Sequence, residues 1–210
     1  LDAILTGPGH GTLSVAAIDQ TSGVLTSAPG SPYTVNSPGG SSATPDSRFL
    51  YVPNIDNRTI TGYAINRATG VLTLAPNSPF AAGLPIDPPT IDPSGRFLYA
   101  TDQENPRVFG YRIDGSTGEL TPIAGSPFAL GSRSLALRVD STGRFAYVLS
   151  KTAAPADALA LHSFSIDATT GAITVAGTMH FETTPSYILT IRATDTLAPA
   201  NQVDSALTID

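Results

Sequence analysis

The sequence has no cysteine and no tryptophan, and Lys151 is its single lysine. Without cysteine, the chain has no disulfide, no thiolate metal ligand and no thiol redox motif. It also lacks the run of about 18 apolar residues that a membrane-spanning helix needs. These absences exclude a membrane span and several redox and zinc-binding classes. What remains is a globular chain of 210 residues, long enough to bury a core.

Charge is also scarce, since 13% of the residues are charged and the formal net charge is −6. No basic cluster and no interleaving of basic with aromatic residues occurs, which excludes nucleic acid as a partner. The histidines, His10, His162 and His180, lie far apart in the sequence, so we expect neither a metal site nor another cofactor.

The composition also indicates a location. Few charges beside abundant Ser, Thr, Gly, Pro and Ala are typical of a secreted bacterial protein, so we expect the chain to be extracellular or periplasmic. Its abrupt opening, "LDAILTGPGHG", suggests a piece of something longer.

Three motifs recur along the chain with one period. The arginines of "PDSRFLYVPN", "DPSGRFLYATD" and "DSTGRFAYVLS" are Arg48, Arg96 and Arg144, each 48 residues after the last. A second motif reads "AIDQTSGVLT", "AINRATGVLT", "RIDGSTGELT" and "SIDATTGAIT", and a third reads "GSPY", "NSPF" and "GSPF". Because all three keep the same register, the chain is an internal repeat of about 48 residues.

Each repeat predicts four short antiparallel strands, here lettered A to D from the centre outward. "DPSG" suits a tight turn, and Phe97 and Tyr99 alternate with Leu98 as in a strand. "FGYRID" is a second strand, and Gly118 closes a hairpin into "ELTPI". Four strands in about 48 residues are the size of a propeller blade. The fold class is therefore all-β, with β-propeller blades of four antiparallel strands in about four repeats, a partial propeller.

We expect a single propeller domain over residues 1–210. Its units are partial at 1–30, complete at 40–80, 87–128 and 133–177, and degenerate or partial at 185–210. The last complete unit carries an insertion, "KTAAPAD", and the tail offers "PSYILTIR", "TLAPANQ" and "SALTID" as strands A, B and C. An incomplete propeller leaves blade edges open, so self-association through them is an expected property.

The combination of "PSGRFLYATD" with "YRIDGSTGELTPIAGSPF", and their copies, resembles the lactonase-type seven-bladed β-propeller family, which includes 6-phosphogluconolactonase-like proteins. The resemblance is strong over residues 10–178 and weak over 185–210. It implies the propeller fold, and it implies lactone hydrolysis as one activity among relatives that often have no assigned reaction. Since members of the family usually have seven blades, it also implies that this chain either holds part of a ring or closes with fewer blades by pairing its ends.

The tail has a second resemblance. Residues 164–195 are similar to the second half of a bacterial cadherin-like repeat, in which Glu182 and Asp195 would help to bind calcium. The acidic element of that family is weakened here to "MHFE", and the blade register is kept, so we prefer the propeller.

Propeller sites lie at the mouth of the central channel, on loops that lead into strand A or join strand B to strand C. Asp102, Glu104 and Arg107 share one such loop and are candidates for substrate binding, with carboxylates to move protons and a guanidinium to hold an anion. The alternative is a solvated loop with a local ion pair.

Two further loops carry candidates. His180 and Glu182 would act as a catalytic base and its orienting partner, or else are a surface histidine beside a strand-edge glutamate. Arg133 would clamp a carboxylate or phosphate, or else pairs with Asp87, itself a candidate for substrate binding. The repeating arginines predict a structural role at a turn, and His162 is expected to be a sheet residue.

Three functions are compatible with these patterns. The first is a secreted propeller module that binds a protein or carbohydrate ligand, or serves as a scaffold in a larger surface protein. The second is a lactone hydrolase in which Arg133 holds the substrate and His180 or Glu182 activates water. The third is calcium-dependent adhesion through the tail. Whether the protein is an enzyme stays open from the sequence.

Overall fold

The computed structural model describes residues 3–6, 11–19, 21–85, 87–151, 159–180, 187–194 and 202–209. This part of the chain consists of strands, turns and irregular segments and contains no helix. In particular, the described residues hold no helix long and apolar enough to cross a membrane.

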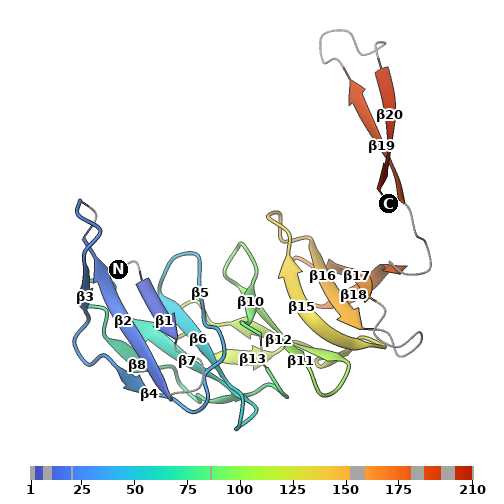
Figure 1. Ribbon diagram of the computed structural model, residues 1–210. Helices are drawn as coiled ribbons and strands as arrows, with labels where there is room; N and C mark the ends of the chain where they lie inside the picture. The colour runs from blue at the N-terminus through green and yellow to red at the C-terminus, as the bar shows by residue number, and fades with distance from the viewer. Residues whose placement is uncertain are drawn as a thin grey trace.

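Four antiparallel sheets follow one another along the chain (Figure 1). The first sheet contains β1 (Ala3–Thr6), β2 (Thr12–Ile18), β3 (Leu25–Ser27) and β4 (Tyr33–Thr34). The second contains β5 (Ser42–Ala43), β6 (Phe49–Asn54), β7 (Thr59–Ile65), β8 (Leu72–Leu74) and β9 (Phe80–Ala81). The third contains β10 (Thr90–Ile91), β11 (Phe97–Asp102), β12 (Arg107–Ile113), β13 (Leu120–Pro122) and β14 (Phe128–Ala129). The fourth contains β15 (Arg133–Val139), β16 (Phe145–Lys151), β17 (Leu159–Ile166) and β18 (Ile173–His180).

In the second, third and fourth sheets, the first four strands lie side by side in the order in which they follow one another along the chain. The order is β5-β6-β7-β8 in the second sheet, β10-β11-β12-β13 in the third and β15-β16-β17-β18 in the fourth, all antiparallel. Figure 1 shows the sheets side by side in sequence order, from the blue N-terminal end to the orange fourth sheet. The predicted fold class, propeller blades of four antiparallel strands in a partial propeller, is confirmed.

In the third and fourth sheets, the turn between strands A and B is held by an aspartate. The carboxylate of Asp92 accepts hydrogen bonds from the backbone amides of Arg96 and Phe97, at 2.8 and 2.7 Å. Asp140 binds the amides of Arg144 and Phe145 in the same way, both at 2.9 Å. The "DPSGRF" motif is thus an aspartate-capped turn that starts strand B in a fixed direction.

Strand D is interrupted in the second and third sheets. β13 and β14 both pair with β12, as β8 and β9 both pair with β7, and a gap separates the two pieces. The serine of the "SP" motif fills the gap, because Ser126 Oγ accepts a hydrogen bond from the buried Gly110 amide at 2.9 Å. Ser78 binds the Gly62 amide likewise at 3.0 Å, and the proline after each serine follows a cis peptide bond.

The hydrophobic core lies between the sheets. β11 is buried along its whole length because it has a neighbour on both faces. Phe97 and Tyr99 pack in one cluster with residues of the fourth sheet, while Leu98 and Ala100 pack with residues of the second. Alternate side chains of β11 therefore pack against two different neighbouring sheets. In a sheet with one face exposed, they would alternate between the core and solvent.

One contact recurs between neighbouring sheets, from the second sheet to the fourth, and is called the joint below. Arg48, Phe49 and Tyr51 of β6 and its turn meet the hairpin between β12 and β13. The Tyr51 hydroxyl donates to the Gly118 carbonyl at 2.9 Å, and Arg48 donates to the Gly115 carbonyl at 2.6 Å. A side chain on Gly118 would come within 2.4 Å of the Phe49 ring, so glycine permits the approach.

The joint recurs one unit later, between the third and fourth sheets. The Tyr99 hydroxyl donates to the Gly171 carbonyl at 2.6 Å, and Arg96 donates to the Ala168 carbonyl at 2.6 Å. The expected structural role of the repeating arginines is therefore confirmed for Arg48 and Arg96, which link two sheets as well as flanking a turn.

The tail forms a separate hairpin. β19 (Tyr187–Thr194) pairs along its length with β20 (Gln202–Ile209), and Figure 1 draws this pair away from the fourth sheet. The segments expected as strands A and C lie in β19 and β20. The expected strand B between them, and most of the insertion in the fourth unit, lie outside the described residues.

Candidate functional site

Polar side chains are buried at the end of strand B in each complete sheet. Asn54, Asp102 and Ser150 occupy equivalent positions, 48 residues apart, and are 4%, 0% and 0% exposed. From these positions the chain leaves strand B for the loop to strand C. The edge formed by these loops is called the rim below, and it is the edge where the sequence predicts a site.

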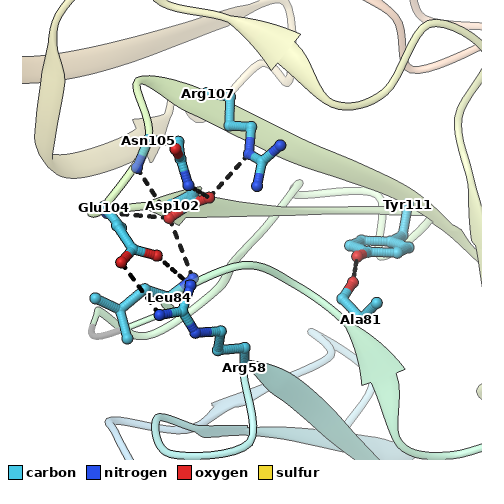
Figure 2. Close-up of polar contacts among 8 residues, drawn as sticks. All are labelled: Arg58, Ala81, Leu84, Asp102, Glu104, Asn105, Arg107 and Tyr111. Carbon is cyan, nitrogen blue, oxygen red and sulfur yellow. Dashed lines mark hydrogen bonds and ion pairs between the residues drawn. The ribbon is translucent and has the colours of Figure 1, made fainter.

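In the third sheet, the carboxylate of Asp102 accepts most of the hydrogen bonds that order the rim (Figure 2). One carboxylate oxygen accepts hydrogen bonds from the amides of Leu84, Glu104 and Asn105, at 3.0 to 3.2 Å. The other accepts from the Asn105 side chain at 3.1 Å and from Arg107 Nε at 2.8 Å. The carboxylate therefore holds its own loop and the end of the preceding loop in one geometry.

These contacts set the charge of Asp102. Burial raises the pKa of the carboxyl, but the hydrogen bonds from Asn105, Arg107 and the backbone amides outweigh it and lower the pKa to about 2. The group is therefore an anion at any pH near neutral. An ionised carboxylate can stabilise a nearby positive charge, such as that of Arg107, and can hold the backbone amides of its loop. It has no proton to donate to a substrate.

A second ion pair crosses between two sheets. Arg58, in the loop between β6 and β7, donates to both carboxylate oxygens of Glu104, one of them at 3.1 Å (Figure 2). The two side chains are 52% and 47% exposed, and the pairing raises the pKa of Arg58 through its hydrogen bond with Glu104. The pair thus presents a guanidinium and a carboxylate together at the surface of the rim.

The structure brings most of the predicted loop residues together. Asp102 pairs with Arg107, whose guanidinium also lies over the Phe109 ring, 5.2 Å from its centroid. Asp87 accepts a hydrogen bond from the Gln103 side chain at 2.8 Å. The local ion pair considered for this loop is present, although its role toward a substrate stays a prediction.

Arg133 stands apart from this group. It is the exposed first residue of β15, with its backbone opposite Lys151. No ion pair joins Arg133 to Asp87, both of which the structure describes, so the structural pairing considered for them is wrong. Asp87 instead accepts its hydrogen bond from the side chain of Gln103.

Sequence reasoning missed a cluster in the fourth sheet. His162 Nε2 lies 2.8 Å from Ser150 Oγ and 3.1 Å from Ser132 Oγ, and the two hydroxyls are 2.8 Å apart. His162 is a sheet residue, as expected, but a half-buried one that belongs to the rim. The signal was available: at the position equivalent to Asn54 and Asp102, the repeat changes to serine.

The remaining predicted residues are in the tail. His180 is the last residue of β18, with its backbone opposite Ala160. Glu182 and Asp195 lie outside the described residues. The pairing of His180 with Glu182 and the calcium site with Asp195 thus stay predictions. Elsewhere in the described chain, no three Asp, Glu or His side chains gather as a metal site would require.

A comparison with protein families decides the relationship of the chain. The model of the family described as "Lactonase, 7-bladed beta-propeller" matches residues 10–135, more than half of the sequence. The chain belongs to this lactonase family. The repeat motifs that carry the resemblance in the sequence are the same ones that build the turns and joints of the structure.

Solved structures resemble this lactonase-family propeller in fold. A putative 6-phosphogluconolactonase from Bacteroides uniformis is 12% identical with a TM-score of 0.65, over 95% of this chain and 65% of that one. The periplasmic gluconolactonase of Pseudomonas aeruginosa is 17% identical with a TM-score of 0.62, over 94% of this chain and 63% of that one. A functionally unknown protein from Desulfotomaculum acetoxidans is 13% identical with a TM-score of 0.67, over 83% and 51%.

The chain spans between half and two thirds of the length of these structures. At such identities the likeness is one of fold. A comparison with curated protein sequences finds no significant match.

Proposed function

We propose that the chain belongs to a secreted propeller that binds a protein or carbohydrate ligand at the rim, or serves as a scaffold in a larger surface protein. The observation that supports this most is the state of Asp102. It is ionised near neutral pH and surrounded by donors, so it holds the loops of the rim in one geometry and cannot act as a general acid. A rigid polar rim loses little entropy when a ligand binds.

The exposed groups of the rim suit a polar ligand. Arg58 and Glu104 offer donors and acceptors side by side, in the arrangement that hydroxyl-rich molecules can bridge. The low charge of the chain supports a location outside the cytoplasm, and so does its likeness to a periplasmic gluconolactonase.

Calorimetric titration with gluconate, glucose and glucuronate tests the binding function. We expect saturable binding of at least one of these probes and a loss of affinity of at least tenfold in the double variant Arg58→Ala, Glu104→Ala. Arg67→Ala is the matched control, because Arg67 is also exposed but lies in the hairpin between β7 and β8, at the other end of the sheet. An affinity that is the same in the double variant as in wild type would contradict a site at this rim.

Lactone hydrolysis is the second candidate, supported by family membership and by the rim of the fourth sheet. There the exposed Arg133 follows Ser132, which contacts His162. In this function Arg133 holds the anionic end of a sugar lactone, and His180 or Glu182 activates water. Attack of that water on the lactone carbonyl opens the ring ester to a hydroxy acid.

A hydrolysis assay on 6-phosphogluconolactone, whose phosphate is the anionic end that Arg133 would hold, separates the two candidates. A lactonase accelerates ring opening above the buffer rate, with Arg133→Ala raising KM and His180→Ala or Glu182→Gln lowering kcat. Arg67→Ala should leave both constants unchanged. A protein that binds the probes above but adds nothing to the buffer rate is a binding module, which would exclude hydrolysis of this lactone.

A further inference from the structure

The rim of the fourth sheet has side chains that can react, where the rim of the third sheet has an ion pair. Ser150 takes the repeat position of Asp102, and Ser132 takes that of Leu84. Together with His162 they form the serine–histidine cluster, in which each polar atom lies within hydrogen-bond distance of the other two.

The serine–histidine cluster lies on the side of the fourth sheet that packs against the third. Alternate residues of a strand share a face, so Ser150 lies on the same face of β16 as Val148. His162 shares its face of β17 with Phe164 in the same way, and the two rings are 6.5 Å apart. Val148 and Phe164 pack in one core cluster with Phe97 of the third sheet, so two described sheets enclose the site.

The hydrogen bonds of the cluster form a path for a proton. Ser132 Oγ donates to Ser150 Oγ at 2.8 Å, and Ser150 Oγ lies 2.8 Å from His162 Nε2. Ser132 Oγ is also 3.1 Å from the same nitrogen. Ser150 is 0% exposed, whereas Ser132 and His162 are half-buried and can be reached from solvent. A serine hydroxyl within hydrogen-bond distance of an imidazole nitrogen is the arrangement of an activated nucleophile.

The backbone next to Ser132 leaves room for a substrate. In the third sheet, a Cβ built on Gly83 would come within 2.5 Å of the Asp102 carboxylate, which fills the space there. Gly131 has the equivalent position in the fourth sheet and a similar positive φ of 76°, yet among the described residues its Cβ would meet no atom within 4 Å. The shorter side chain of Ser150 therefore frees space directly beside the Ser132 hydroxyl.

A buried hydroxyl beside the cluster has no partner. Ser134 lies opposite Ser150 in the pairing of β15 with β16, so the two side chains share a face. Ser134 is 0% exposed, and its Oγ is the buried side-chain polar atom of the described residues that lacks a hydrogen-bond partner. Such an atom is uncommon in a folded protein and calls for an acceptor. The carbonyl oxygen of a bound ester is an acceptor that gains negative charge during attack.

We propose that the serine–histidine cluster is a second site, which cleaves carboxylic esters through a covalent acyl-enzyme. Ser132 Oγ bonds to the ester carbonyl carbon while its proton passes, directly or through Ser150, to His162 Nε2. The bond from that carbon to the alcohol oxygen then breaks, and the alcohol leaves with the proton from His162. Water attacks the acyl group in the same way, which releases the acid and restores Ser132.

This activity is distinct from both functions proposed above. Ligand binding by Arg58 and Glu104 uses loops of the second and third sheets. Lactone hydrolysis by water that His180 or Glu182 activates leaves no acyl group on the protein. A covalent adduct on Ser132 therefore separates this site from the others.

Reaction of the full chain with a fluorophosphonate ester, followed by measurement of the intact mass, tests the nucleophile. We expect one adduct per chain, located on Ser132 by peptide mapping, and no adduct in Ser132→Ala. His162→Gln should slow labelling by roughly 100-fold, which is within the usual contribution of a general base. Ser116→Ala, which changes an exposed turn serine, should be labelled at the wild-type rate.

The absence of cysteine allows a second test that does not depend on the fluorophosphonate. Ser132→Cys places a single thiol beside His162, and an imidazole close to a thiol favours the reactive thiolate. Iodoacetamide at pH 7 should alkylate this variant roughly tenfold faster than Ser116→Cys, whose thiol is in an exposed turn. The additional change His162→Gln should remove the difference.

A wild-type chain that the fluorophosphonate does not label would overturn the proposal. Labelling that persists in Ser132→Ala would overturn it too, since another side chain would then be the nucleophile. The same holds if Ser132→Cys and Ser116→Cys are alkylated at equal rates. Circular dichroism of each variant verifies that it is folded, and labelling should be unchanged in the double variant Arg58→Ala, Glu104→Ala.

Discussion

At the scale of single residues, Asp102 makes the stability of the fold depend on pH. Its pKa of about 2 lies below the value of about 3.9 in an unfolded chain, so it stabilises the fold above pH 4. That contribution is lost as the pH falls through 4 toward 2, and amounts to about 2 kcal/mol. Asp102→Asn should therefore be less stable than wild type by about 2 kcal/mol at pH 6, with the gap closing near pH 2. Urea unfolding across this range measures the gap.

Glu104→Gln is the control for this experiment. Its ion pair with Arg58 is half exposed, and such pairs contribute little, roughly 0 to 1 kcal/mol. A gap between wild type and Asp102→Asn that does not change with pH would mean that the carboxylate charge of Asp102 is not what stabilises the rim.

The close approach of the second and third sheets depends on the absence of a side chain at Gly118. Gly118→Ala places a methyl group against the Phe49 ring and also forces alanine into a positive φ. The strained φ costs roughly 1–2 kcal/mol and the collision roughly 1–3 kcal/mol more. Gly131→Ala has the first penalty only, so denaturant unfolding should show Gly118→Ala to be less stable than Gly131→Ala by at least about 1 kcal/mol. Equal stabilities would contradict the close approach.

At the scale of elements, the interrupted strand D depends on its serine. Ser126→Ala removes the acceptor of the buried Gly110 amide, and an unsatisfied buried donor costs about 1–3 kcal/mol. We expect a loss of that size in the free energy of unfolding, together with faster hydrogen exchange at Gly110. Ser116→Ala, in an exposed turn, should change stability by less than about 0.5 kcal/mol. Unaltered exchange at Gly110 would show that another group satisfies its amide.

The strands themselves could be predicted from the sequence, because alternating residues and repeated turns encode them locally. The interruption of strand D could not. "GSPF" indicates a turn, but the partner of its serine is an amide 16 residues earlier, and such a distant contact leaves no local pattern. The same holds at the rim, where the loop of Asp102 was predicted as a site while Arg58, 46 residues before Glu104, was not. His162 was missed because its serine partners come from two other strands or loops.

At the scale of the whole molecule, equivalent positions should differ in energy according to whether a neighbouring sheet covers them. Tyr99→Phe removes the hydrogen bond to Gly171 inside a joint and should cost about 1 kcal/mol. Tyr147→Phe at the same repeat position should leave the monomer unchanged, since Tyr147 is exposed. Unfolding measured at low protein concentration compares the two. Equal losses would mean that Tyr147 has a partner within its own chain.

The joint is built from segments of a single unit, a face on strand B and a hairpin between strands C and D, so it is the same wherever it occurs. A stretch of gene encoding one unit can therefore be duplicated or deleted by recombination without any need for a new interface to evolve. Proteins built in this way change length by whole blades, and a family with one usual blade number can give rise to rings of another size.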